Sequence, residues 1–211
     1  VDLARFYLFQ VSGSTAFFMV GVLLFVLISG VRFLRGYIED SNVRARADMY
    51  RQLAYVDALT RLGNRNAYEE RLAQIDANLL NYEHIWCLSA DIDNLKKTND
   101  RLGHAAGDKL IADTAKILFS ALTENSHVYR TGGDEFVCFL LDVPEETIME
   151  CLMALSEGLE TYNKKAEEPI YLSYAADCFR PETDDRVGEL VIRVDALMYE
   201  MKARNRNRME A

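Results

Sequence analysis

A run of 26 residues without a charged side chain, between Arg5 and Arg32, constrains this chain more than any other feature. As a helix it would rise about 39 Å, more than the ~30 Å hydrocarbon core of a bilayer. Such a helix satisfies its own backbone hydrogen bonds. We therefore expect residues 1–35 to form a transmembrane helix. The alternatives are a buried core helix and a signal peptide, but Arg32 and Arg35 follow where a signal peptide would carry small residues.

Positive charge flanks this run unevenly. One arginine, Arg5, precedes it, and five follow it: Arg32, Arg35, Arg44, Arg46 and Arg51. The positive-inside rule then predicts an inner (cytoplasmic) membrane protein with its C-terminal domain in the cytoplasm. Because the chain opens on Val1 and enters the apolar run almost at once, we also expect a longer protein with an upstream sensor region.

Residues 36–56 contain no proline and predict a charged linker helix. Two sets of residues repeat every seven positions: Ile38, Ala45 and Gln52, and Asn42, Met49 and Val56. The seam is broken by polar residues, so it is compatible with a parallel two-stranded coiled coil and equally with a solvated single helix.

Composition excludes several classes of function. The formal charge of −9 argues against non-specific nucleic-acid binding, which needs a basic surface. The four cysteines form no CxxC pair and have no histidine at ligand spacing, which argues against a zinc site. Cys87 and Cys138 lie in apolar runs, so we interpret them as buried hydrophobic residues of a protein in a reducing compartment.

From residue 57 onward, helical and strand patterns alternate. Apolar runs predict strands at 85–92, 127–130, 136–141 and 170–176, and helical periodicity predicts helices at 66–82, 104–122, 145–163 and 190–203. This order indicates that residues 57–211 form one α/β (α+β) sandwich, with helices flanking a mixed sheet.

Two acidic pairs in this domain suggest metal chemistry. Asp91 and Asp93 end the first strand, and Asp134 and Glu135 follow two glycines at a hairpin turn. If the hairpin neighbours that strand, Asp91 and Asp134 can share Mg²⁺ or Mn²⁺, as in phosphoryl or nucleotidyl transfer. Asp93 is equally well explained as a turn or helix cap.

Other residues have side chains or backbone that could bind the phosphates and the base of a nucleotide. Gly133 would let the backbone approach phosphates, and the cations are Lys96, Lys202 and Arg206. The last two also fit a solvated basic helix end. Asn99 and Asp108 lie in a segment that we expect to be a loop, and together they could recognise a guanine edge. Turn and cap roles compete with that interpretation.

Taken together, these residues resemble the GGDEF-domain diguanylate cyclases. The signature string is Gly132-Gly-Asp-Glu-Phe136. Four further blocks stand in the family's order: Asp57–Arg65 (DALTRLGNR), Asp91–Asp100 (DIDNLKKTND), Gly103–Asp108 (GHAAGD) and Asp195–Lys202 (DALMYEMK).

The resemblance implies a fold like nucleotidyl cyclases and polymerase palms, and condensation of two GTP into cyclic di-GMP by a homodimer. It implies that Asp91, the Ile92 carbonyl and Asp134 bind metal, and that Glu135 and Lys96 are catalytic. The implied substrate-binding residues are Asn99, His104, Asp108, Gly133, Lys202 and Arg206.

Departures from the family pattern matter as well. The Arg-x-x-Asp product-inhibition site is replaced by Thr123–Ser126 (TENS), so we expect no inhibition through it. Asn205 stands where the family has glycine, and Asp108 favours strict use of GTP. A GTP-binding module without catalysis and a membrane-linked dimerisation scaffold are the alternatives. The binding module is less favoured because the signature and Asp91 are intact, and the scaffold because only the weak heptad seam supports it.

Overall fold

The computed structural model describes residues 18–38, 49 and 52–209, with side chains up to Asn205 at the C-terminal end. It divides into two compact units, Val1–Tyr50 and Arg51–Ala211. The first unit contains a helix of 21 residues, Phe18–Ile38, with a mean hydropathy of 2.0 and none of its apolar window buried. By length and composition this helix could cross a membrane. Residues 1–17 of the predicted span lie outside the described residues.

The predicted linker helix is described only in part. Residues 36–38 continue the apolar helix and residues 52–55 are helical. Residues 39–48, 50 and 51 lie outside the described residues, and Asn42 and Ala45 of the heptad pattern are among them. The coiled-coil interpretation therefore stays a prediction.

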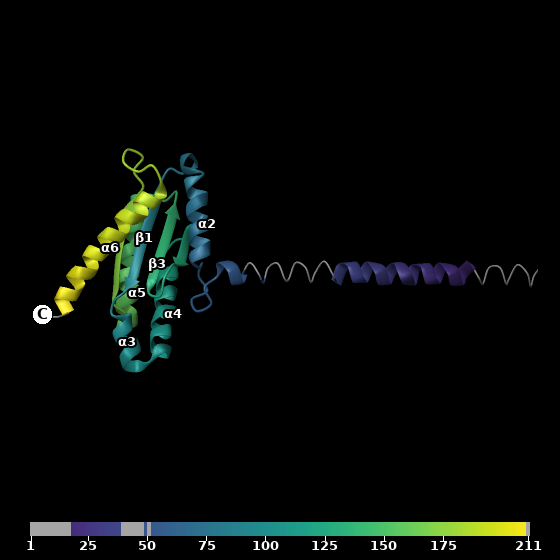
Figure 1. Cartoon of the computed structure of the whole chain (residues 1–211), viewed down its shortest axis with the longest axis horizontal. Coiled ribbons are helices and arrows are strands. Elements are labelled where there is room, and N and C mark those ends of the chain that lie inside the picture. The colour runs from purple at the N-terminus through teal and green to yellow at the C-terminus, as the bar shows by residue number, and fades with distance from the viewer. Residues whose placement is uncertain (1–17, 39–48, 50–51, 210–211) are drawn as a thin grey trace, which may run out of the picture. The chain divides into compact units, whose positions relative to one another are not determined.

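The second unit is built on a four-stranded sheet in the order β2-β3-β1-β4 (Figure 1). The strands are β1 (Ile85–Ile92), β2 (Ser126–Arg130), β3 (Glu135–Leu141) and β4 (Leu172–Cys178). The predicted strand at 85–92 is confirmed to the residue. The predicted fourth strand is displaced by two residues, since it runs from Leu172 to Cys178 rather than from 170 to 176.

The sheet is less mixed than we expected. All three strand pairs are antiparallel, and among the described residues parallel pairing occurs only at the isolated bridge between Gly63 and Tyr129. The physical reason is the order of the strands. Helical connections do join strands that run the same way, β1 to β2 and β3 to β4. In each case an antiparallel strand lies between the two.

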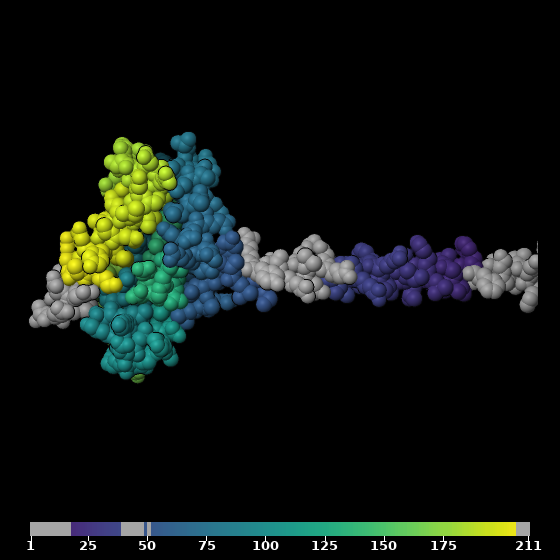
Figure 2. Space-filling view, in the orientation of Figure 1, coloured from purple at the N-terminus to yellow at the C-terminus, as the bar shows by residue number. Residues whose placement is uncertain are grey.

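Helices cover both faces of this sheet, as the α/β sandwich requires (Figure 1). Helices α4 (His104–Ala121) and α5 (Glu145–Asn163) pack on alternate residues of the central strands, such as Leu88 and Phe136. Helices α2 (Arg65–Asp76) and α6 (Val187–Met209) pack on the other residues, such as Cys87 and Phe139. The space-filling view shows α6 in yellow and α2 in blue on the outside of the unit (Figure 2).

The cysteines behave as the sequence predicts. Cys87 and Cys138 are fully buried among these apolar side chains, and burial raises the pKa of both thiols. All four cysteines are free.

One helix was missed in the sequence. The segment that we expected to be a loop contains α3 (Leu95–Leu102), which a glycine with φ +84° at position 103 separates from α4. Six polar residues between Leu95 and Leu102 hide the helical period, because only those two leucines, seven positions apart, mark its apolar face. The helix predicted at 66–82 ends at Asp76 and is followed by a short 3₁₀ turn, Leu79–Asn81.

A buried ion-pair network fixes α6 against the end of β4. The guanidinium of Arg193 donates to both oxygens of Asp184 (2.5 and 2.9 Å), to Asp177 (2.7 Å) and to the Cys178 carbonyl (2.9 Å). These hydrogen bonds hold the pKa of Asp184 below its usual value, although burial opposes them. Since only 3% of the Asp184 side chain is exposed, the carboxylate depends on Arg193 for its charge balance.

We expect Arg193→Gln to lower the free energy of unfolding by about 3 kcal/mol at pH 7, because it leaves a buried carboxylate without its cation. In the wild type the pKa of Asp184 is lowered, so its contribution is present above pH ~4 and is lost below it. In the variant the buried carboxylate has lost its cation, so protonation of Asp184 relieves the penalty as the pH falls. The difference between the two proteins should therefore shrink as the pH falls, as measured by urea unfolding from pH 7 to pH 4.

Arg180→Gln is the matched control. Arg180 binds the same Asp177 (2.9 Å), but 55% of its side chain is exposed. Its loss should cost less than about 1 kcal/mol. Equal effects of the two substitutions would contradict the role assigned to burial.

Candidate active site

The end of β1 presents polar side chains to α6. Alternation along the strand places Ser89 and Asp91 on the same face as Cys87, beneath α6, and both are almost fully buried. Each has a partner on that helix, and the two partners are about two turns apart. The Ser89 hydroxyl donates to Asp195 (2.6 Å), and the Lys202 ammonium donates to Asp91 (2.5 Å).

The glycine hairpin lies beside the same strand end, which was the condition for the predicted acidic site. In the β1–β3 register Asp91 faces Glu135, and the Ile92 N–H donates to the Asp134 carbonyl (3.1 Å). The main chain of the hairpin is thus fixed to the main chain at Asp91. Three of the predicted acidic residues, Asp91, Asp134 and Glu135, come together here.

Opposing effects act on the Asp91 carboxyl. Burial raises its pKa most, the hydrogen bond from Lys202 lowers it, and the charge of Asp134 raises it again, so that the net pKa lies above the usual value. Two neighbouring carboxylates in a partly dehydrated site repel each other unless a cation lies between them.

The donor set fits a hard divalent cation. Asp91, Asp134 and the Ile92 carbonyl offer oxygen ligands only, the kind that Mg²⁺ and Mn²⁺ prefer. Among the described residues, no group of three or more His, Cys, Asp or Glu side chains is arranged so that it could hold a metal ion. A cation here would therefore take its remaining ligands from water or from the phosphates of a nucleotide.

Of the two predicted phosphate-binding residues on α6, the structure describes the side chain of Lys202 but not that of Arg206. Lys202 is bound to Asp91, 111 positions away, and its side chain is 24% exposed. The Arg206 side chain lies outside the described residues, although α6 includes its backbone. Lys202 therefore already belongs to the acidic site rather than to a solvated helix end.

Asp93 has a hydrogen-bond partner on β4, and the residue at the N-cap of α3 is its neighbour Asn94. The Ser173 hydroxyl donates to both Asp93 oxygens (2.9 Å each), and the Asn205 amide donates to Ser173 (3.2 Å). This chain of hydrogen bonds joins β4 and α6 to the turn that begins α3. Asn205, the residue that replaces the family's glycine, is one of its members.

Two residues that sequence reasoning left without a role fix the hairpin. Arg130 donates to the Gly133 carbonyl (2.8 Å) and to both oxygens of Asp57 (3.2 Å each). Asp57 also accepts from the N–H and hydroxyl of Thr60 (2.8 and 2.7 Å). Partial burial raises the pKa of Asp57, but Thr60 and Arg130 together outweigh it and lower the pKa. No local pattern could reveal a pair 73 positions apart.

The predicted base-recognition residues lie on two successive helices, Asn99 on α3 and Asp108 on α4. The Asn99 side chain lies against Gly107, which is followed directly by Asp108, an exposed residue of α4. Lys96 on α3 and His104 at the start of α4 are also exposed. The described side chains predicted to contact GTP therefore lie at the surface or are half-buried, Lys202 included.

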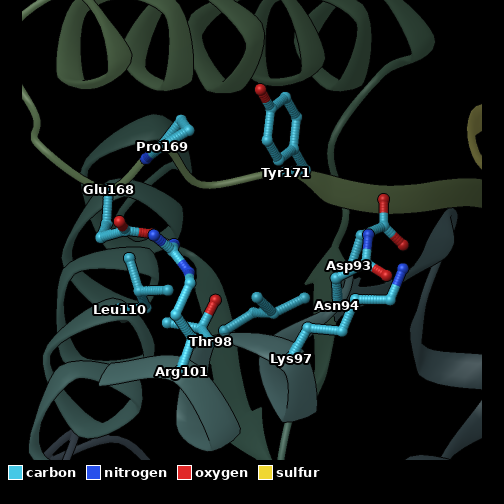
Figure 3. Close-up of a pocket in the computed structure, with 10 residues that line it drawn as sticks. Asp93, Asn94, Lys97, Thr98, Arg101, Leu110, Glu168, Pro169 and Tyr171 are labelled. Carbon is cyan, nitrogen blue, oxygen red and sulfur yellow. The ribbon is translucent and has the colours of Figure 1, made fainter. Parts of the chain in front are cut away.

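A separate cavity of about 540 Å³ lies on another face of α3 (Figure 3). Its α3 side chains are Lys97, Thr98 and Arg101, and Glu168, Pro169 and Tyr171 face them. Arg101 forms an ion pair with Glu168 (2.5 Å). Asp93 lines this cavity, whereas Asp91, Asp134, Asn99 and Asp108 do not. The cavity is therefore distinct from the acidic site.

Comparison with known proteins agrees with the family resemblance of the sequence and with the fold. Residues 54–208 match the family described as "Diguanylate cyclase, GGDEF domain". The chain belongs to the GGDEF-domain family. It is 33% identical over 175 residues to a diguanylate cyclase of Vibrio cholerae, and the match covers 79% of this chain and 52% of that protein. The chain thus spans about half the length of this GGDEF relative, and 12% and 16% of two others.

Solved GGDEF structures share the fold. The coiled coil and GGDEF domain of DgcB from Caulobacter crescentus, in complex with c-di-GMP, has a TM-score of 0.70 at 22% identity, covering 82% of this chain and 93% of that one. The isolated GGDEF domain of TpbB from Pseudomonas aeruginosa has a TM-score of 0.61 at 29% identity, covering 71% and 90%. The predicted sandwich of a sheet with flanking helices is therefore confirmed.

We expect Asp57→Asn and Arg130→Gln each to lower the free energy of unfolding by about 2 kcal/mol, the scale of a charged hydrogen bond. Since the two side chains form one unit, the double variant should lose little more than either single variant. Chemical unfolding of all four proteins measures the coupling energy.

Arg65→Gln is the control, because Arg65 forms an exposed ion pair with Glu69 (3.0 Å) and should change stability by less than about 0.5 kcal/mol. Additive losses at Asp57 and Arg130 would refute the coupling.

Proposed function

We propose that this protein is an active diguanylate cyclase that condenses two GTP into cyclic di-GMP and two pyrophosphates. The observation that carries the proposal is the meeting of Asp91, Asp134 and Lys202 at the end of β1, beside the glycine hairpin. Family membership supports the reaction, and the intact acidic residues favour catalysis over a binding module.

The reaction needs two copies of the chain. Each subunit holds one GTP, and the 3′-oxygen of each GTP attacks the α-phosphorus of the other. A new P–O bond forms, the bond from the α-phosphorus to the bridging oxygen breaks, and pyrophosphate leaves. The proton of the 3′-hydroxyl passes to Glu135, which is exposed and faces Asp91 across the β1–β3 pair. Two such steps close the ring, so the active form is a homodimer.

The other roles are those that the family resemblance implies, and the positions of the side chains support them. Asn99 and Asp108 contact guanine at the junction of α3 and α4, with His104 beside them. Gly133 admits the phosphates close to the hairpin backbone, and Lys96 stabilises the transition state. Lys202 and Arg206 bind phosphates. Before substrate arrives, Lys202 balances the charge of Asp91, and the phosphates then share its ammonium group.

Asp91, the Ile92 carbonyl and Asp134 would hold Mg²⁺ or Mn²⁺. When bound, the metal ion neutralises phosphate charge and polarises the attacked phosphorus. The chain's own contribution is to hold the main chain of Asp134 beside that of Ile92, since the Ile92 N–H donates to the Asp134 carbonyl.

The N-terminal part would connect this site to a membrane. We propose that residues 1–35 anchor the chain in the cytoplasmic membrane, that residues 36–56 transmit a signal from an upstream sensor region, and that residues 57–211 face the cytoplasm as the catalytic domain. The apolar helix Phe18–Ile38 and the arginines that follow it support this topology. Nucleic acid is not a proposed partner.

The decisive experiment measures nucleotides made by the whole 211-residue chain in lipid nanodiscs that hold two copies, with GTP and Mg²⁺. We expect cyclic di-GMP, resolved by chromatography. Asp134→Ala should lower the rate of cyclic di-GMP formation at least about 100-fold, because it removes a carboxylate proposed to hold the metal ion. Glu157→Ala, an exposed residue of α5, should leave the rate unchanged. A folded dimer that binds GTP but leaves it unchanged would overturn the proposal.

Product inhibition gives a second prediction. Thr123 and Ser126 stand where the family's inhibitory Arg and Asp would be, and their hydroxyls contact each other (3.1 Å). Without a guanidinium to bind the product, the initial rate should not fall when cyclic di-GMP is added at concentrations equal to GTP. A steep fall in rate that survives Thr123→Ala would mean that another surface binds the product.

A further inference from the structure

The space that a side chain at Gly107 would occupy is filled by the amide group of one residue, Asn99. A Cβ atom at this residue would lie 2.0 Å from the Asn99 Oδ1 and 2.9 Å from its Cγ. Real Cβ atoms do not approach other atoms below 3.0 Å. Any residue other than glycine would therefore push the Asn99 amide away from α4.

The backbone does not require glycine here. Gly107 lies inside α4 and lacks a positive φ, whereas Gly103 has one. Alanine is the better helix former, so glycine at this position weakens α4. The reason for glycine is therefore the space that it leaves for Asn99.

The position of the Asn99 side chain lowers the stability of the fold. Its backbone carbonyl accepts from the Gly103 N–H (2.8 Å), which fixes the end of α3. Its Oδ1 is buried without a hydrogen-bond partner, one of two such side-chain atoms in the described part of the chain. A buried acceptor without a partner destabilises the fold, and such groups collect at functional sites.

The orientation of the amide decides which chemistry Asn99 offers. Oδ1 is the atom nearest to Gly107, and Nδ2 is farther from it, at 3.2 Å from the Cβ position. The carbonyl edge thus points at α4, which leaves the N–H₂ group as the available edge. Asp108, the exposed residue that follows Gly107 on α4, supplies an acceptor. A donor beside an acceptor matches guanine, which carries a keto oxygen and N–H groups, and mismatches the amino group of adenine.

We propose that Gly107 is a positioning residue: by leaving space for the carbonyl edge of Asn99, it turns the amide N–H₂ toward the base and sets the preference for guanine nucleotides. This inference rests on the proposed function, since it assumes that the base binds at Asn99 and Asp108.

The test is a double-mutant cycle on the full chain in nanodiscs, with the α,β-methylene analogues of GTP and ATP as probes and calorimetry as the readout. These analogues bind but cannot be cyclised. Gly107→Ala should weaken binding of the GTP analogue about 10-fold, the value of one hydrogen bond, and reduce the preference over the ATP analogue by the same factor. Asn99→Ala should have a similar effect. The double variant should differ from Asn99→Ala by less than 2-fold in affinity, because the Asn99 amide that the added methyl would displace is absent from both.

Gly158→Ala is the matched control. Gly158 is also an interior helix glycine, and its Cβ would meet only the end of the Ile117 side chain, at 3.0 Å. This variant should bind both analogues like the wild type. If Gly107→Ala alone fails to fold, Asn99→Ala combined with Gly107→Ala should fold, since it removes the clash. If neither of these two variants folds, the loss of folding does not come from contact between the added methyl and Asn99, and the inference is wrong.

The outcomes separate the two proposals. If the wild type binds neither analogue, the proposed function fails. If the wild type prefers the GTP analogue and Gly107→Ala matches it, or if the two substitutions act additively, the positioning role is wrong while the proposed function stands.

Discussion

The rest of the structure depends on how the polar groups buried at the end of β1 are paired, above all the carboxylate of Asp91 with the ammonium of Lys202. This strand is central in the sheet and covered on both faces, yet its α6 face changes from Cys87 to Ser89 and Asp91. A carboxylate in that position is costly without a cation, and Lys202 supplies one from α6. The ion pair therefore fixes the helix while it assembles the acidic site, so that fold and site share one interaction.

The same helix is held along its length by further polar contacts. Arg193 anchors its first turns to Asp184 and Asp177, Asp195 accepts from Ser89, and Asn205 reaches Ser173. Apolar packing by Leu190 and Val194 fills the space between these contacts. Because hydrophobic packing has little directional preference and charged hydrogen bonds have a strong one, the polar contacts set the register of α6 and hence the position of Lys202.

Both candidate binding regions use glycine to let another group come close. At the hairpin, a Cβ on Gly132 would lie 2.5 Å from a Glu135 oxygen, and at Gly107 it would displace Asn99. In neither case is a positive φ the reason. The hairpin is then secured by Arg130 and Asp57, whose pairing joins the beginning of the domain to the signature turn. Preorganisation of this kind lowers the entropic cost of binding a nucleotide.

The sequence alone determined the features that depend on local pattern. The strand 85–92 and the helix 145–163 were predicted to the residue, because an unbroken apolar run and a regular helical period are local signals. The signature string and its accompanying blocks identified the family. The chemistry of Asp91, Asp134, Asn99 and Asp108 suggested their roles before the family was identified, and the family motifs imply the same roles.

Only the tertiary structure decided which distant residues meet. It turned a predicted loop into α3, placed an antiparallel strand between each pair of strands that a helix connects, and matched Lys202 to Asp91 across 111 positions. It also paired Asp57 with Arg130 and brought Asn99 against Gly107. The physical reason is that periodicity reports which face of an element is buried, whereas the partner of a buried charge depends on how all the elements pack.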